Sequence, residues 1–150
     1  MSIATKDHTL HTNNKKFVAI LNKRAELGMQ LNALAHLSLS IGTLSKTQGE
    51  SPSFADYVDH SDVTHPNISD HPFVVLKAHN STKLRELRQK FESLDLPVTD
   101  FTHLMAQGDT RQRMALTTET EEQDLTYLGI CTFAEADVVD QLTNEFSAYQ

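Results

Sequence analysis

Three short and almost uninterrupted apolar runs most constrain how this chain can fold. They span residues 17–21, 73–78 and 127–133. A run that is apolar at nearly every position is typical of a strand buried on both faces, because a strand with one solvent-exposed face alternates apolar and polar residues. Helix-length segments separate the runs, and strands that alternate with helices form α/β sheets. We therefore expect an α/β fold, a three-layer sandwich with helices packed on a mixed sheet of about four to five strands.

The segment 27–46 is the longest predicted helix, and it has two apolar faces. One face carries Leu27, Leu31, Leu34, Ser38 and Ile41, and the other carries Met29, Ala33, Leu37 and Leu44. A helix that is apolar on two sides has two partners, and only one of them can be the sheet. A symmetric dimer would bury the other face against a second copy, so we expect a homodimer.

The rest of the chain supplies shorter elements. A helix is predicted from Asn80 or Ser81, either of which can cap it. A strand over 98–104 should follow Pro97, and a short helix over 110–116 should follow that strand. The closing helix begins near Glu135, where acidic residues suit the helix dipole.

Two stretches carry little regular structure by this reasoning. Residues 47–72 contain several turn dipeptides, so we predict an irregular stretch with one brief strand at 57–58. Residues 1–14 are polar and without periodicity, so we predict a flexible N-terminal tail there. A single domain is then expected over residues 15–150.

The composition of the chain indicates which cellular compartment and which partners to expect. The 150 residues include no run near the ~20 apolar residues of a membrane helix and no secretory signal, so we expect a cytoplasmic protein and no membrane partner. Cys131 is the one cysteine and cannot form an internal disulfide. The net charge of −7 repels phosphate backbones, so we expect no nucleic-acid partner.

Four segments resemble a known bacterial family. They read KKFVAILN, LGMQLNALAHLSLSIG, HPFVVLKAHNSTKLRELRQKFESLDLPV and LTYLGICTFAEADVVDQLTNEFSAY, and the likeness extends from Lys15 to Gln150. Together they resemble a family known only as a domain of unknown function, the one numbered two thousand. That family is related to the type II peptidyl-tRNA hydrolases. The resemblance therefore implies a type II peptidyl-tRNA hydrolase-like fold and a tendency to dimerise.

The hydrolase motifs are only partly present. Where the hydrolases carry Gly-Lys-Gly-Lys after the first strand, this chain has residues 26–30, which keep Gly28 and lack both lysines. His36 matches the histidine of the hydrolase helix, but Ala33 stands where the hydrolases have Gln. His103 lies approximately where they have Asp. The resemblance thus implies the fold without the activity.

The best candidate site lies where the first strand ends and the first helix begins. Ligands of open α/β sheets bind at the carboxyl ends of the strands, and a helix N-terminus favours an anion. The ligand-binding candidates are Lys23, Arg24, Gly28, Gln30, Asn32, His36 and His103. The alternative interpretation makes the turn merely solvated and Gly28 a tight bend. For Asn32 and His36, the interpretation we favour is a structural hydrogen bond to the sheet edge.

No cofactor or metal site is predicted. His60, His65 and His71 supply donors, but their spacing matches no established zinc pattern. Cys131 falls in a buried strand, where a thiol behaves as a small hydrophobe. No P-loop, dinucleotide fingerprint or nucleophile elbow is present.

Three functions remain open from the sequence. The first is an uncharacterised cytosolic protein that binds a small or anionic ligand at the start of its first helix. The alternative is a diverged peptidyl-tRNA hydrolase that acts on the ester of peptidyl-tRNA. The third is a structural or regulatory dimer module with no cleft chemistry.

Overall fold

The structure is a computed structural model that describes residues 14–149. The predicted tail lies outside the described residues except for Asn14. A mixed five-strand sheet has the order β5-β6-β1-β4-β7, which confirms the predicted α/β class and sheet size. Its strands are β1 (Lys15–Asn22), β4 (Phe73–Ala78), β5 (Val98–Thr102), β6 (Tyr127–Glu135) and β7 (Ser147–Ala148).

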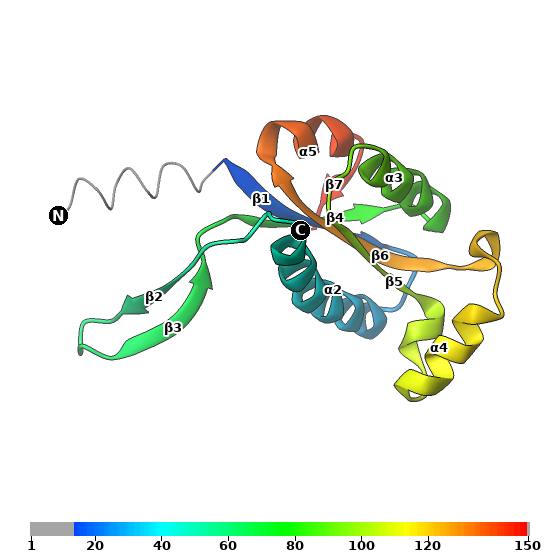
Figure 1. Cartoon of the computed structure of the whole chain (residues 1–150), viewed down its shortest axis with the longest axis horizontal. Coiled ribbons are helices and arrows are strands. Elements are labelled where there is room, and N and C mark those ends of the chain that lie inside the picture. Colours follow the sequence, from blue (N-terminus) through cyan, green and yellow to red (C-terminus); the bar gives the residue numbers. More distant parts are fainter. Residues whose placement is uncertain (1–13, 150) are drawn as a thin grey trace.

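Helices cover both faces of this sheet (Figure 1). One face carries α2 (Leu27–Thr47), and the other carries α3 (Ser81–Ser93) and α5 (Ala136–Thr143). The chain crosses from β1 to its parallel neighbour β4 through α2, and then returns past β1 to β5 through α3. Because crossovers of one hand in opposite directions place their helices on opposite faces, α2 and α3 lie on different sides.

The sheet is buried on both sides, as the apolar runs predicted. Along β1, Val18 and Ile20 join the cluster under α3, whereas Phe17, Ala19 and Leu21 join the cluster under α2. Strand β6 is buried from its first residue to the last but one. A strand with two covered faces needs apolar side chains at odd and even positions alike, which accounts for the continuous runs.

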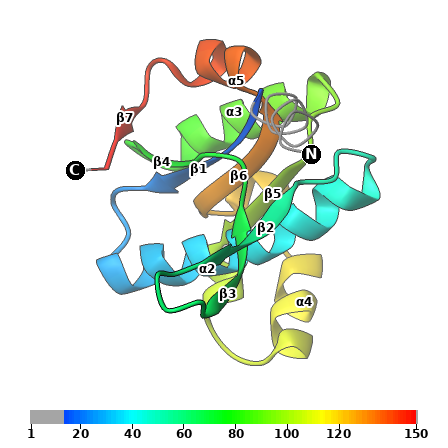
Figure 2. The ribbon, with the colours of Figure 1, turned by 90° about the vertical axis from the view of Figure 1, so that its left-hand side faces the viewer.

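A β-hairpin stands apart from this body. It consists of β2 (Phe54–Val58) and β3 (Thr64–Ser69), which form a separate two-strand sheet. We call residues 54–69 the arm; Figure 2 shows it crossing in front of α2. The sequence predicted only a brief strand at 57–58. The second strand was missed because it contains Pro66 and a register shift, next to Asn67 with a φ of 71°.

The buried face of α2 differs from the predicted one. The residues that pack on the sheet are Gln30, Ala33, Leu37, Ile41 and Ser45. Leu27 and Leu31, expected on a packed face, are 67% and 56% exposed. A helix with apolar residues nearly all round does not reveal from its pattern which face meets the sheet.

The smaller elements follow the sequence with shifted boundaries. The strand expected over 98–104 ends at Thr102, where the 3-10 helix η1 (His103–Ala106) begins. The short helix is present as α4 (Thr110–Thr118), and η2 (Glu122–Asp124) lies in the acidic stretch after it. Strand β7 was not anticipated. Among the described residues, no helix is long and apolar enough to cross a membrane.

Candidate functional site

One edge of the sheet collects the carboxyl ends of its parallel strands. Strands β1 and β4 end there at Asn22 and Ala78, which pair with each other. Strand β5 ends at Thr102, opposite Tyr127, where antiparallel β6 begins. Helices α2 and α3 start from the same edge. This is the region where ligands bind in open α/β sheets.

The turn from β1 to α2 is held rigidly by its backbone. The buried Asn22 donates from Nδ2 to the carbonyl of Tyr127 at 3.0 Å, and its Oδ1 accepts from the amide of Arg24 at 3.0 Å. The amide of Lys23 donates to the carbonyl of Ala78 at 3.0 Å. The turn therefore presents the exposed Lys23 and Arg24 from a fixed backbone, and no ion pair to either appears among the described residues.

The N-terminus of α2 is open, unlike those of two other helices. Its N-cap residue, Glu26, makes no side-chain capping bond. In contrast, Asn80 caps α3 by accepting from Lys83 at 3.0 Å, and Asp109 caps α4 within a capping box. Gly28 lies inside the first turn of α2, with nothing within 4 Å of the position where a Cβ would be. It is a helical residue and does not form the tight bend that was one interpretation.

Gln30 is a structural residue in this geometry. Its side chain is buried, and Nε2 donates to the carbonyl of Ala25 at 2.8 Å. Its Oε1 accepts from the hydroxyl of Tyr149, beyond β7. Because both ends of the amide are engaged, Gln30 ties the C-terminal segment to the β1–α2 turn and has little capacity left for a ligand.

Asn32 and His36 lie on the exposed side of α2. The ring of His36 stacks on Phe101 of β5, with 5.1 Å between ring centroids. Within residues 14–149 neither side chain makes a hydrogen bond, so the structural bond to the sheet edge, the interpretation we favoured, is wrong. His36 also lines an open groove of about 610 Å³ between α2 and β5, together with Leu39 and Thr99.

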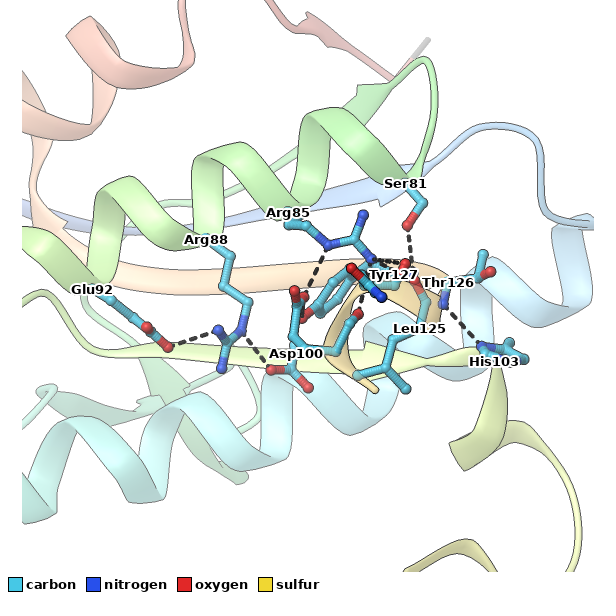
Figure 3. A network of polar contacts seen from close by, with 11 residues as sticks. Ser81, Arg85, Arg88, Glu92, Asp100, His103, Leu125, Thr126 and Tyr127 are labelled. Atoms are coloured by element: carbon cyan, nitrogen blue, oxygen red, sulfur yellow. Dashed lines mark hydrogen bonds and ion pairs between the residues drawn. The ribbon is translucent and has the colours of Figure 1, made fainter. Parts of the chain in front are cut away.

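His103 follows β5 and is separated from β1 by β6. Its amide donates to the carbonyl of Thr126 at 2.9 Å, and its Nδ1 accepts from the Thr126 amide at 3.0 Å (Figure 3). An Nδ1 that accepts from an amide places the ring proton on Nε2. With two strand spacings of about 4.8 Å between β5 and β1, His103 is not part of the Lys23–Arg24 turn.

The most extensive polar network lies on the α3 side and was missed from the sequence (Figure 3). Arg85 donates to Glu122 at 2.9 Å and to the carbonyl of Leu125 at 2.7 Å, while the Tyr127 hydroxyl donates to Glu122 at 2.7 Å. Burial and the bond to Glu122 raise the pKa of Tyr127 to about 12. The bonds from Tyr127 and Arg85 lower the pKa of Glu122. Arg88 extends the network to Asp100 at 2.7 Å.

The remaining reactive side chains are dispersed or buried. His65 bonds to Asp59 at 2.8 Å on the arm, whereas His71 is buried against Phe17 and Phe133. Within residues 14–149, no group of three or more His, Cys, Asp or Glu side chains is placed to hold a metal ion. Burial raises the pKa of the Cys131 thiol, so its thiolate is disfavoured.

Comparison with known proteins places this fold in a family. The sequence model described as "Protein of unknown function (DUF2000)" matches residues 15–150. The chain belongs to this family. A solved structure of the protein of unknown function Atu0240 from Agrobacterium tumefaciens strain C58 is similar, with a TM-score of 0.74 and 20% sequence identity. The alignment covers 91% of this chain and 98% of that one. A search of curated proteins found no match.

Proposed function

We propose that this DUF2000 protein binds a small molecule bearing an anionic group at the β1–α2 turn. The observation that carries the proposal is the coincidence of two exposed cations, Lys23 and Arg24, with the uncapped N-terminus of α2. A helix N-terminus carries a partial positive charge of about half an elementary charge, and its first amides point outward. Phosphate and carboxylate groups share the chemistry that such a turn recognises.

The surroundings support an anion at this point. The chain as a whole has a charge of −7, so two adjacent cations on a fixed backbone form a local exception that concentrates small anions. The carboxylate of Glu26 opposes them, which leaves the two cations and the helix dipole in excess. The hydrogen bonds of Asn22 hold the backbone in place before a ligand arrives, so little conformational entropy is lost on binding.

Hydrolysis of peptidyl-tRNA is the alternative that the resemblance raises, and two features count against it. Met29, which stands in the segment of the missing lysines, packs against the core cluster under α2. A thioether stabilises no developing oxyanion, and Gln30 beside it is already bonded at both ends. Lys23 is the cation in this turn that could substitute. We propose ligand binding without cleavage of the ester.

The experiment follows backbone amide resonances while inorganic phosphate, adenosine monophosphate or citrate is added at low salt. At least one probe should shift the amides of residues 23–30, with weaker binding at high salt because exposed charges are screened. The Lys23→Ala, Arg24→Ala double variant should bind at least about tenfold more weakly, a change of about 1.4 kcal/mol. Lys90→Ala on α3 is the matched control and should leave the affinity unchanged. Shifts confined to other elements, or none up to about 10 mM of each probe, would contradict the proposal.

Cleavage is tested separately with an N-blocked aminoacyl-tRNA and an authentic hydrolase as the positive control. The protein should release no amino acid above background. Turnover within about tenfold of the control that Lys23→Ala abolishes would show that Lys23 restores the activity.

A further inference from the structure

Exposed apolar side chains are concentrated on three elements. Ten of the fourteen large apolar side chains that are exposed in residues 14–149 lie on α2, on the arm or on α4. They are Leu27, Leu31 and Leu39 of α2; Phe54, Tyr57, Val58, Val63 and Ile68 of the arm; and Met114 and Leu116 of α4. Apolar side chains gathered in this way mark an interaction surface, whereas isolated ones do not.

The outer face of α2 has no charged residue over most of its length. From Leu27 to Ser45 the helix contains no Asp, Glu, Lys or Arg, although Leu31 and Leu39 are 56% and 75% exposed. The outer face of a surface helix is normally charged, and loss of charge is the compositional mark of an interface core. A face without charge can also pack against its own copy with no like-charge repulsion.

The arm is exposed and yet firmly anchored. Every side chain of β2 is exposed, and an isolated two-strand hairpin is at best marginally stable in water. At its base the amide of Ser53 donates to Nε2 of the buried His71 at 3.0 Å, and its hydroxyl donates to Asp70 at 2.6 Å. The arm is therefore held in a set direction while its apolar side chains lack cover. It contains three aspartates and no lysine or arginine.

The first half of helix α4 carries charge of the opposite sign, whereas the exposed Glu119 caps its C-terminus. The helix itself contains Arg111 and Arg113 and no acidic residue, beside the exposed Met114 and Leu116. The carboxylate of Asp109, just before the helix, is engaged in the capping box. Leu116 also lines an open groove of about 460 Å³ along this helix. Apolar side chains beside two arginines suit an apolar, acidic hairpin.

The arm and α4 lie at opposite ends of the molecule, both on the α2 side of the sheet (Figures 1 and 2). Helix α2 runs across the line from the arm to α4 (Figures 1 and 2), so a two-fold axis that lies beside α2 and along it would bring the arm of each copy toward the α4 of the other. We propose that α2, the arm and α4 form one interface with a second copy of this chain. In it the two α2 helices pack side by side and parallel, and each arm lies on the partner's α4.

The size of the surface suits this arrangement. Helix α2 has 21 residues and is about 31 Å long. A stable interface hides about 1,600 Å² in total, more than is expected from the packing of two such helices, and the two arms supply the remainder. The arrangement also accounts for the second apolar face of α2. It does not depend on a ligand at the β1–α2 turn.

The first test is the molar mass of the full chain by light scattering at about 50 μM, with an arm-less variant beside it. Phe54 pairs with Ser69, so residues 55–68 can be replaced by Gly-Gly without removing a fully buried side chain. The natural chain should have twice the monomer mass of 16.8 kDa, and the arm-less variant should have the monomer mass with an unchanged circular dichroism spectrum of the body. A monomeric natural chain, or an arm-less variant that dimerises as tightly, would overturn the proposal.

A charge exchange tests the contact between arm and α4. Arg111→Glu with Arg113→Glu should raise the dimer dissociation constant about tenfold, because it places like charges opposite each other. Adding His60→Lys and Asp62→Lys at the arm tip should bring the constant back to within about threefold of the natural chain. Lys90→Glu on α3 is the matched control and should change nothing. If the fourfold variant is no tighter than the arginine pair variant, the arm does not meet α4 and the proposal fails.

Discussion

The two helical layers of this protein pack on the same sheet in similar ways but differ in their outer surfaces. Helix α3 packs Leu84, Leu87 and Phe91 on the sheet and presents charged residues outward, several of which are tied into ion pairs. Helix α2 packs an equally apolar inner face, but its outer face has leucines and no charge as far as Ser45. The α3 side has the charged, ion-paired composition of an ordinary solvent-exposed surface. The α2 side has the composition of an interface.

The two sides also differ in whether their polar side chains form hydrogen bonds across the fold or within one helix. On the α3 side Arg85, Glu122 and Tyr127 satisfy one another and link α3 to β6. On the α2 side the outer polar groups of the helix bond mainly within it, as Ser38 does to the carbonyl of Leu34 at 2.7 Å. Long-range polar bonds fix the tertiary structure, whereas local ones leave the face free for other contacts. This contrast is what we expect if the outer face of α2 packs against a second copy, as proposed, while α3 stabilises the fold.

The largest effects should come from the two inner faces, which ought to behave alike. Leu37→Ala under α2 and Leu84→Ala under α3 remove side chains with no exposed area. Each should lower the free energy of unfolding by about 2–5 kcal/mol, through lost burial and the cavity left behind. Urea unfolding measures both. A loss below about 1 kcal/mol at Leu37 would show that α2 is not part of the same core.

The outer faces should then separate the two helices. Arg85→Ala removes bonds to Glu122 and to the carbonyl of Leu125, so it should cost about 1–3 kcal/mol of stability and leave the molar mass unchanged. Leu39→Asn should leave the stability of the monomer within about 0.5 kcal/mol and weaken dimerisation. Unfolding curves and light scattering on both variants check this. If Arg85→Ala weakened dimerisation and Leu39→Asn lowered the stability of the monomer, the comparison of the two helices would be wrong.

Acid should weaken the α3 side slightly. The pKa of Glu122 is lowered by its bonds from Tyr127 and Arg85, so the folded state holds this carboxylate ionised. A lowered pKa adds stability above the unfolded value of about 4.3 and loses it as the pH falls through the folded value. The stability difference between the natural chain and Glu122→Gln should therefore be larger at pH 7 than at pH 3. Because half of the side chain is exposed, the effect should stay below about 1 kcal/mol. An equal difference at both pH values would contradict it.

Metal removal should have no effect on the stability of the protein. The structure distributes His60, His65 and His71 between the exposed arm and the buried base. Dialysis against EDTA should leave the melting temperature unchanged. A fall of about ten degrees, several kcal/mol for a chain of this size, would show a metal that supports the fold.

The sequence predicted those parts of the fold that depend on local pattern. Strands β1, β4 and β6 follow from apolar runs, and α3 and α4 begin at recognisable caps. The orientation of α2 was not predictable, because Leu31 and Leu37 are equally apolar and only the sheet decides which is buried. The arm could not be predicted because the side chains of β2 are all exposed in this chain, so its sequence has no pattern of buried positions.

The candidate site was predicted only in outline. Lys23 and Arg24 do lie at the carboxyl end of β1, as the fold class implied. The role of Gln30 depends on Tyr149, which is 119 residues away, and no local pattern reports such a pairing. His103 proved to be tied to the backbone of Thr126, and that bond depends on how β5 pairs with β6.

Hydrogen exchange of the natural chain at two concentrations tests most directly whether the α2 side is an interface. The amides of the arm and of α4 should exchange more slowly at about 200 μM than at about 1 μM, because dimerisation adds protection to exposed, locally stable segments. The amides of α3, on the opposite face, should exchange at the same rate at both concentrations. Concentration-dependent protection in α3, or none in the arm and α4, would contradict the division of the molecule into a stabilising side and a binding side.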